Sequence, residues 1–187
     1  CRMTILGDKA QTLDEQMRDV LQFLPGVFDQ KIRKIVMNKS YRNTMEIARY
    51  AEKLTGVKDV ELLKRHGKEV VEEQFQTEDA VLDEIFLKAK LGEDEYETAA
   101  IITMTEAEAS TLYQILKARG EEVHYIDRNS SVFKKGLTVT TFYLAKGLEF
   151  DQVFGVFQDS GNPMLNQAKY ICATRALHEL YMYQITE

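Results

Sequence analysis

The feature that most constrains the fold of this chain is a short polar loop between two strand-like segments, residues 137–141 and 153–157. Both segments have the apolar patterns typical of buried strands. The loop between them carries a cation, a glycine and a carboxylate, namely Lys146, Gly147 and Glu149. A glycine lets the backbone approach a ligand closely. The loop therefore predicts a ligand site in which Lys146 meets a phosphate and Glu149 accepts hydrogen bonds from a pair of hydroxyls such as a ribose.

The segments around this loop predict an α/β fold with a parallel sheet flanked by helices. Residues 98–103 form a continuous apolar run, as expected for a strand buried on both faces. Thr105 and Glu108 then form a capping box for a helix that Gly120 closes, and another strand follows. This strand–helix–strand order favours parallel strands. Further strands are expected at residues 2–6, 31–37, 67–75, 123–126 and 181–185, and helices at 14–23, after Asn43, after Thr77 and at 164–177, with Pro163 starting the last one.

Composition limits the class of protein. The 187 residues are 44% hydrophobic, enough for one core, and the net charge of −6 is not that of a protein that coats nucleic acid. No run of 18 apolar residues and no leader pattern occurs, so neither a membrane span nor a signal peptide is indicated, and we expect a cytoplasmic protein. Cys1 and Cys172 do not make a disulfide framework, and the three histidines lack metal-ligand spacing.

Four segments, in order, resemble conserved motifs of superfamily 1A DNA helicases of the UvrD, Rep and PcrA type. The run Lys-Gly-Leu-Glu-Phe at 146–150 resembles the fifth motif of that family. Gly-Asp-x-x-Gln at 7–11 resembles the third, residues 38–44 the fourth, and Tyr-Ile-Cys-Ala-Thr-Arg-Ala at 170–176 the sixth. The resemblance implies a RecA-like (P-loop NTPase-type) fold, the second motor lobe of such a helicase.

The same resemblance implies a division of the chain. Residues 1–30 would be the C-terminal remnant of the first RecA-like lobe, and residues 31–187 the second lobe, of the 2A type. Only the short loop 127–135 stands where the large relatives insert a 2B-type domain, which is closer to the HelD-like branch. The chain starts without an initiating Met, within a segment that is strand-like, so we expect it to be a C-terminal piece of a longer protein.

The resemblance also assigns roles to single residues. Arg42 and Arg175 would stabilise the transferring phosphate of ATP, and Gln11 would contact its terminal phosphate. An Arg just before a helix N-terminus lies where anions are favoured, and its planar fork can bind two phosphate oxygens. The remaining assignments are Tyr41 to the adenine, Lys146, Gly147 and Glu149 to ATP, and Thr141 and Tyr143 to DNA, with Tyr143 in place of the family's His.

These roles imply the C-terminal part of an ATP-dependent DNA helicase or translocase that uses ATP and Mg²⁺ in the intact protein. Its partners would be single-stranded or partly duplex DNA and the first RecA-like lobe of the same chain. No Gly-x-x-x-x-Gly-Lys-Ser/Thr loop is present, so the fragment alone is expected to be inactive and to bind neither ATP nor Mg²⁺ itself.

Two alternatives stay open. Met104 and Glu106 stand where the relatives carry an Asn and an Arg that touch DNA, which favours a HelD-like ATPase that binds and recycles RNA polymerase. The other alternative is a non-catalytic RecA-like binding module. A P-loop upstream in the parent gene would argue against the second.

Overall fold

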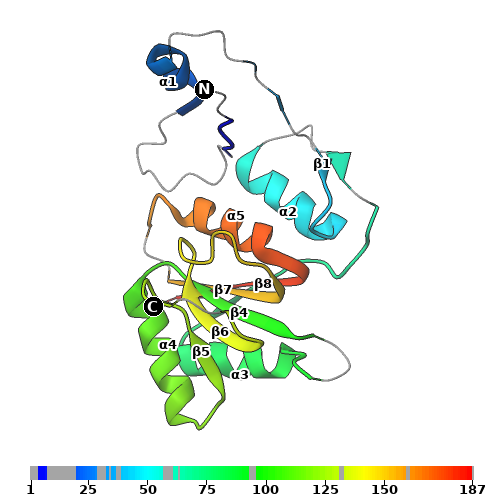
Figure 1. The fold of residues 1–187 in the computed structure, drawn as a ribbon. Coiled ribbons are helices and arrows are strands. Elements are labelled where there is room, and N and C mark those ends of the chain that lie inside the picture. The colour runs from blue at the N-terminus through cyan, green and yellow to red at the C-terminus, as the bar shows by residue number, and fades with distance from the viewer. Residues whose placement is uncertain are drawn as a thin grey trace.

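A six-stranded, all-parallel sheet forms the centre of the computed structural model (Figure 1). The structure describes residues 4–7, 20–28, 33, 35–36, 39–56, 61–62, 64–92, 96–130, 133–158 and 161–186. In spatial order the strands are β3 (Val71–Phe75), β8 (Ala176–Ile185), β7 (Phe150–Gln158), β4 (Thr98–Thr103), β6 (Gly136–Thr141) and β5 (Val123–Tyr125). The predicted α/β class and its parallel sheet are confirmed.

Helices cover both faces of this sheet, because every central strand is apolar on both sides. One face packs against α5 (Leu165–Arg175), which in turn carries α2 (Met45–Thr55), and against the crossover 142–148. The other face packs against α3 (Glu78–Lys88) and α4 (Glu106–Ala118). Two separate apolar clusters result, one on each side of the sheet.

The strands all begin on one side of the sheet, called here the amino edge, and end on the opposite side, the carboxyl edge. At the amino edge the strands begin, for example at Thr98, Phe150 and Ala176; at the carboxyl edge they end, for example at Thr103, Thr141 and Gln158. The chain leaves β4 toward β5 through α4 on one face, and leaves β7 toward β8 through α5 on the other. The ends of β4 and β7 are therefore a topological switch point.

Local capping signals in the sequence correspond well to the helix starts. Thr105 and Glu108 form the complete capping box of α4, and the Thr77 side chain accepts a hydrogen bond from the Ala80 amide at the start of α3. Gly120 adopts a φ of 80°, which suits a residue without a Cβ at the end of a helix. Helix α5 starts at Leu165 rather than at Pro163, and it ends at Arg175, where β8 begins.

The start of α2 differs from the prediction. The cap is Thr44, whose hydroxyl accepts from the Ile47 amide, and not Asn43. Glu46 does not reach back to close a capping box; its carboxylate instead lies 2.9 Å from His66 Nδ1 and accepts from the Gly67 amide at 2.8 Å. Glu46 therefore binds groups about twenty residues further along the chain, and not the backbone at the start of its own helix.

The region before α2 also departs from the prediction. Residues 4–7, 33 and 35–36 are in neither helix nor strand, so the strands expected at 2–6 and 31–37 are wrong where the structure describes them. The two-residue β1 (Lys39–Ser40) pairs instead with β2 (Glu61–Leu62). Helix α1 (Val20–Phe28) contains Pro25 and extends beyond residue 23, where the helix predicted at 14–23 ends.

Across the described part of the chain, none of the helices combines the length and apolarity needed to cross a membrane.

Candidate functional site

The site builds on an ion pair at the amino edge of the sheet. Arg42 stands just before α2, and Glu149 stands just before β7. The Arg42 Nε lies 2.6 Å from Glu149 Oε1, and the two side chains are 43% and 42% exposed. A cation and a carboxylate that are more than a hundred residues apart in the chain thus meet at an open surface.

Arg175 contacts the loop that carries Glu149, from the end of α5. It is the last residue of α5 and only 3% exposed. Its Nη1 donates to the Leu148 carbonyl at 3.2 Å, while Nε and Nη2 donate to the Thr174 hydroxyl at 3.2 and 3.1 Å. Because Leu148 is the neighbour of Glu149, both guanidinium groups are held against one loop, residues 146–149. We call Arg42, Glu149, Arg175 and this loop the rim.

Asn43 ties the two arginine segments together. Its side-chain amide donates to the carbonyls of Ala173 and Ala176, at 2.9 and 2.7 Å. These two carbonyls flank Arg175 in the chain, so Asn43 fixes the backbone that carries Arg42 against the end of α5. The sequence pattern gave Asn43 only a capping role, because both of its partners lie about 130 residues away.

Glu46 supports this arrangement from inside α2. Hydrogen bonding by His66, and by the Gly67 amide, lowers the pKa of the Glu46 carboxyl to about 2. The Met45 amide also donates to the Arg65 carbonyl at 2.8 Å. The segment before β3 is thereby clamped to the first turn of α2, next to Arg42.

The loop of the rim has a tight backbone. Ala145 donates to the Thr141 carbonyl at 2.9 Å, and Leu148 donates to the Ala145 carbonyl at 3.0 Å. Gly147 adopts a φ of 96°, a conformation that residues with a Cβ rarely take, and the space where its Cβ would stand is open. Lys146 is exposed beside it. A ligand can therefore approach this backbone closely.

The other predicted site residues lie elsewhere or are not described. Tyr41 is beside Arg42 and 65% exposed, while Gln11 lies outside the described residues. Thr141 ends β6 at the carboxyl edge, and Tyr143 follows it. The Thr141 hydroxyl is buried without a hydrogen-bond partner, so in this conformation it offers no surface to DNA. Tyr143 donates its hydroxyl to Glu106.

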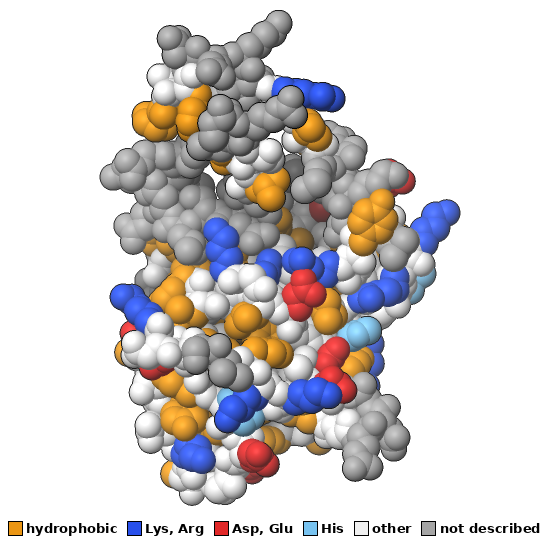
Figure 2. All heavy atoms as spheres, in the orientation of Figure 1, with side chains coloured by type: hydrophobic (Ala, Val, Ile, Leu, Met, Phe, Trp, Pro, Cys, Tyr) orange, Lys and Arg blue, Asp and Glu red, His pale blue; other side chains and the backbone are white. Residues whose placement is uncertain are grey.

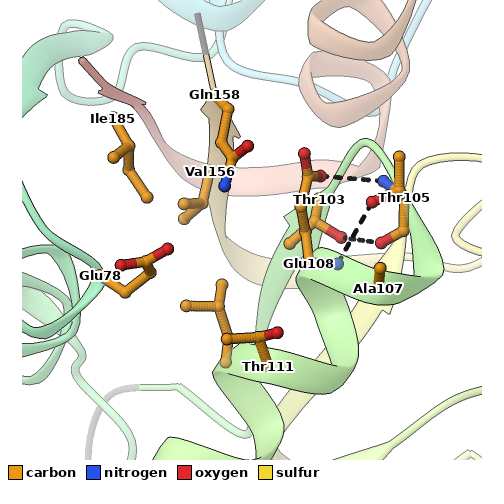
Figure 3. Close-up of a pocket in the computed structure, with 10 residues that line it drawn as sticks. Glu78, Thr103, Thr105, Ala107, Glu108, Thr111, Val156, Gln158 and Ile185 are labelled. Carbon is orange, nitrogen blue, oxygen red and sulfur yellow. Dashed lines mark hydrogen bonds between the residues drawn. The ribbon is translucent and has the colours of Figure 1, made fainter. Parts of the chain in front are cut away.

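The carboxyl edge holds a cavity that sequence reasoning missed (Figure 3). It has a volume of about 270 Å³ and lies at the switch point, where β4, β7 and β8 end and where α3 and α4 begin. Hydroxyl, amide and carboxylate groups line it, among them Thr103, Thr111, Gln158, Glu78 and Glu108. The Glu108 carboxylate is already occupied, since it accepts from the amides of Met104 and Thr105 at 3.0 and 2.9 Å.

In chemical terms the rim suits an anion. Guanidinium groups bind phosphate oxygens through charge-assisted, often paired hydrogen bonds. Arg42 is exposed enough to exchange Glu149 for such a partner, and Glu149 would then be released to accept from hydroxyl groups. Among the described residues, no group of three or more His, Cys, Asp or Glu side chains is arranged to hold a metal ion.

Known structures include one informative relative. This chain is similar to the crystal structure of the C-terminal domain of a possible DNA helicase from Lactobacillus plantarum, with 29% sequence identity and a TM-score of 0.60. The match covers 78% of this chain and 88% of that one. The α/β fold found here, a six-stranded parallel sheet between helices, is thus that of a RecA-like helicase C-terminal domain.

Two structures of arterivirus nonstructural protein 10, a helicase, are more distant. The structure solved with DNA shares 11% identity and the other 13%, each with a TM-score of 0.40. Each match covers 62% of this chain, and 28% and 27% of theirs, so these likenesses carry no argument about function. No model of a known protein family and no curated protein matches the chain.

Proposed function

We propose that this chain is the C-terminal motor lobe of an ATP-dependent DNA helicase and that it supplies Arg42 and Arg175 to ATP bound by another lobe. The observation that carries the proposal is that Arg42 pairs with Glu149 at an exposed loop, while the buried Arg175 donates to the carbonyl of the neighbouring Leu148. The 29% identity to a helicase C-terminal domain supports it. The finer assignment to the UvrD-type superfamily 1A rests on the four sequence motifs.

In the proposed mechanism, the rim is completed when a first RecA-like lobe brings ATP against it. Arg42 leaves Glu149 and neutralises the transferring phosphate together with Arg175, and such an arginine is worth ~10³-fold or more in rate. Glu149 accepts from the ribose hydroxyls, and Gly147 lets the loop backbone approach the nucleotide. Mg²⁺ would be held by the first lobe.

The proposal also gives a reason for exposed apolar side chains early in the chain. Phe23 and Val27 of α1, with Ile35 and Val36, are all more than half exposed. Such side chains are usually covered by a partner surface. We assign residues 1–30 to the end of the first lobe, which would cover them in the intact protein. Hydrolysis would then open and close the two lobes and move the protein along a DNA strand.

The experiment compares two Arg→Lys variants in the full-length protein. Arg42→Lys keeps the charge but loses the planar fork, so steady-state ATP hydrolysis should fall at least ~10²-fold while ATP affinity changes little. Arg49→Lys is the matched control, because Arg49 is an exposed arginine of the same helix segment. Equal turnover in the two variants would contradict the finger assignment. The present chain alone should hydrolyse ATP no faster than a blank.

A second candidate is a HelD-like ATPase that dislodges RNA polymerase from DNA. It is favoured by the carboxyl edge, where Glu106 binds both Tyr143 and Arg128 and so occupies groups that would otherwise face DNA. Only ten residues separate the end of β5 at Tyr125 from the start of β6 at Gly136, so no extra domain is inserted there. Retention of RNA polymerase by the immobilised full-length protein, against a bare matrix, discriminates between the two.

A further inference from the structure

A second concave site lies on the amino edge, separate from the rim. It has a volume of about 470 Å³ and is lined by Arg65, Lys68, Lys90, Tyr96, His178 and Glu179, with Thr44, His66 and Gly67 at its border. These side chains come from three segments, namely the approach to β3, the approach to β4 and the first part of β8. We call it the basic pocket, and we propose that it binds the phosphate group of a nucleotide or of a single nucleic-acid strand.

The charge balance of the basic pocket is opposite to that of the chain. Among the lining side chains, three cations face one carboxylate, and two further carboxylates, Glu46 and Asp151, lie behind the histidines at its border, whereas the whole chain carries −6. A concave surface lined by one sign of charge concentrates its field and attracts the opposite ion. Figure 2 shows Lys, Arg and His side chains gathered on the side of the molecule beside α2.

The one lining carboxylate does not cancel this field, because it serves as the floor of the pocket. Glu179 is 3% exposed and accepts from Lys68, Lys90, Gln152 and Tyr181. Burial would raise the pKa of this carboxyl, but these hydrogen bonds outweigh burial and hold the pKa at about 2. Lys68 lies 2.9 Å from Glu179 yet its side chain is 56% exposed, so donors on the same ammonium face the open pocket.

Arg65 adds a cation whose position is fixed by a hydrogen bond to the backbone. Its Nη2 donates to the Leu177 carbonyl, which fixes the guanidinium against the start of β8. Its Nε is buried and has no hydrogen-bond partner. Because this Nε is buried, Arg65 acts on a ligand in the basic pocket through its positive charge.

An aromatic pair makes the nucleotide the best occupant of the basic pocket. The rings of Tyr96 and His178 are stacked, with centroids 5.3 Å apart and planes at 17°, and Lys90 lies over the Tyr96 ring at 5.8 Å. The His178 side chain is 41% exposed, so part of its ring is accessible to a ligand. Cations beside a flat ring are the combination that binds single strands, through phosphate contacts and base stacking together.

The inference goes beyond the proposed function, because none of the basic pocket residues belongs to the rim. The proposed test is an NMR titration of the ¹⁵N-labelled chain with inorganic phosphate, thymidine 5′-monophosphate and an octathymidylate. We expect amide shifts at Gly67, Lys68 and Lys90. Shifts confined to the rim would support the proposed function and overturn this inference, and no shifts at millimolar ligand would also overturn it.

Two variants and a control sharpen the titration. Lys68→Gln removes one cation while Glu179 keeps its other partners, and it should weaken phosphate binding by roughly fivefold. Lys117→Gln is the control, since Lys117 is exposed on α4 across the sheet. If Lys117→Gln weakens binding as much, only the overall charge matters and the proposal fails.

His178→Ala distinguishes the two sources of the phosphate, because it removes the ring and leaves the three fixed cations. Octathymidylate binding should weaken at least threefold while inorganic phosphate binding stays unchanged. If instead the three ligands bind equally well to this variant and to the parent chain, the nucleotide assignment is overturned. Because His178 is partly exposed, this variant is also the safer one for folding.

Discussion

The two edges of the sheet differ in the charged groups that gather around their concave sites, although the same six strands connect them. The amino edge presents Arg42 and Arg175 at the rim and three further cations in the basic pocket. The carboxyl edge presents Glu78 and Glu108 around its cavity and Glu106 nearby. Ligands of open α/β sheets usually bind at the carboxyl edge, at the switch point. In this chain the electrostatics favour the opposite edge for phosphate.

This difference shows that topology alone does not locate a site. The switch point provides a cavity, but its carboxylates make it unsuitable for a phosphate without a counter-ion. The topology of the sheet does not favour ligand binding at the amino edge. Contacts between segments that are far apart in the chain nevertheless bring several cations together there. Variants at the two edges test whether phosphate is bound at the amino edge and not at the carboxyl edge.

The largest effect is expected for Arg175→Ala in the full-length protein. Steady-state ATP turnover should fall ~10³-fold, because a buried guanidinium aimed at the rim cannot be replaced by water. The measurement is the turnover number, together with nucleotide affinity from a binding titration. Arg128→Ala is the control from the carboxyl edge, where Arg128 is exposed. If both variants lose turnover equally, the two edges do not differ in function.

The next largest effect is expected for Glu46→Gln, and it concerns the stability of the fold rather than the rate of ATP turnover. The Glu46 pKa is lowered from 4.5 to about 2 by the contact with His66 and the Gly67 amide. A lowered pKa in the folded state stabilises above the unfolded-state value, and that stabilisation is lost as the pH falls from about 4.5 toward 2. Glu46→Gln should therefore lower the free energy of unfolding at pH 7 by about 1–2 kcal/mol.

Urea unfolding at pH 7, 5 and 3 checks this expectation. The difference between Glu46→Gln and the parent chain should shrink at pH 3, because Glu46 of the unfolded parent, with its ordinary pKa of 4.5, then binds a proton while the folded Glu46 stays largely ionised. Glu122→Gln, at an exposed position after α4, should follow the parent at every pH. A difference that is independent of pH would mean that Glu46 acts through packing and not through its charge.

Asn43→Ala tests whether the rim needs a positioning residue. Losing the bonds to Ala173 and Ala176 should lower the turnover number about tenfold while the KM for ATP stays within about twofold, because Arg42 is misplaced rather than removed. In a double variant, Arg42→Lys should cost less than it does alone, since the two changes act on one geometry. Strict additivity would show that Asn43 is only a structural link.

Sequence patterns predicted the sheet and its helices where the signals are local. The apolar run 98–103 became β4, and the Thr105–Glu108 box became the start of α4. The prediction was wrong at residues 33 and 35–36, where the structure has no strand. An alternating segment becomes a strand only with a neighbour to pair with, and Ile35 and Val36 are 72% and 69% exposed.

Candidate site residues were only partly accessible from the sequence. Resemblance to motifs brought Arg42, Glu149 and Arg175 together in advance, and their roles in ATP hydrolysis stay a prediction. Asn43 was missed as a link between them, because its partners are distant in sequence. The basic pocket was missed for the same reason, since no single segment contributes enough cations to form a pattern.

The smallest effect is expected at the carboxyl edge, for Glu106→Gln. Glu106 accepts from Tyr143 and lies 2.9 Å from Arg128 Nε, and the Tyr143 contact lowers the pKa of its carboxyl. Removing the charge releases Arg128 to contact phosphate, so single-stranded DNA affinity of the full-length protein should rise about two- to threefold at low salt.

The salt dependence of that affinity decides what the change means. If Arg128 gains a phosphate contact, the slope of log K against log salt should steepen by up to about one. Glu122→Gln removes an exposed charge away from Tyr143 and should leave the slope unchanged. If Glu106→Gln alters neither affinity nor slope, DNA does not pass along the carboxyl edge. The acidic groups there would then have to be explained by a protein partner, as the polymerase-binding alternative requires.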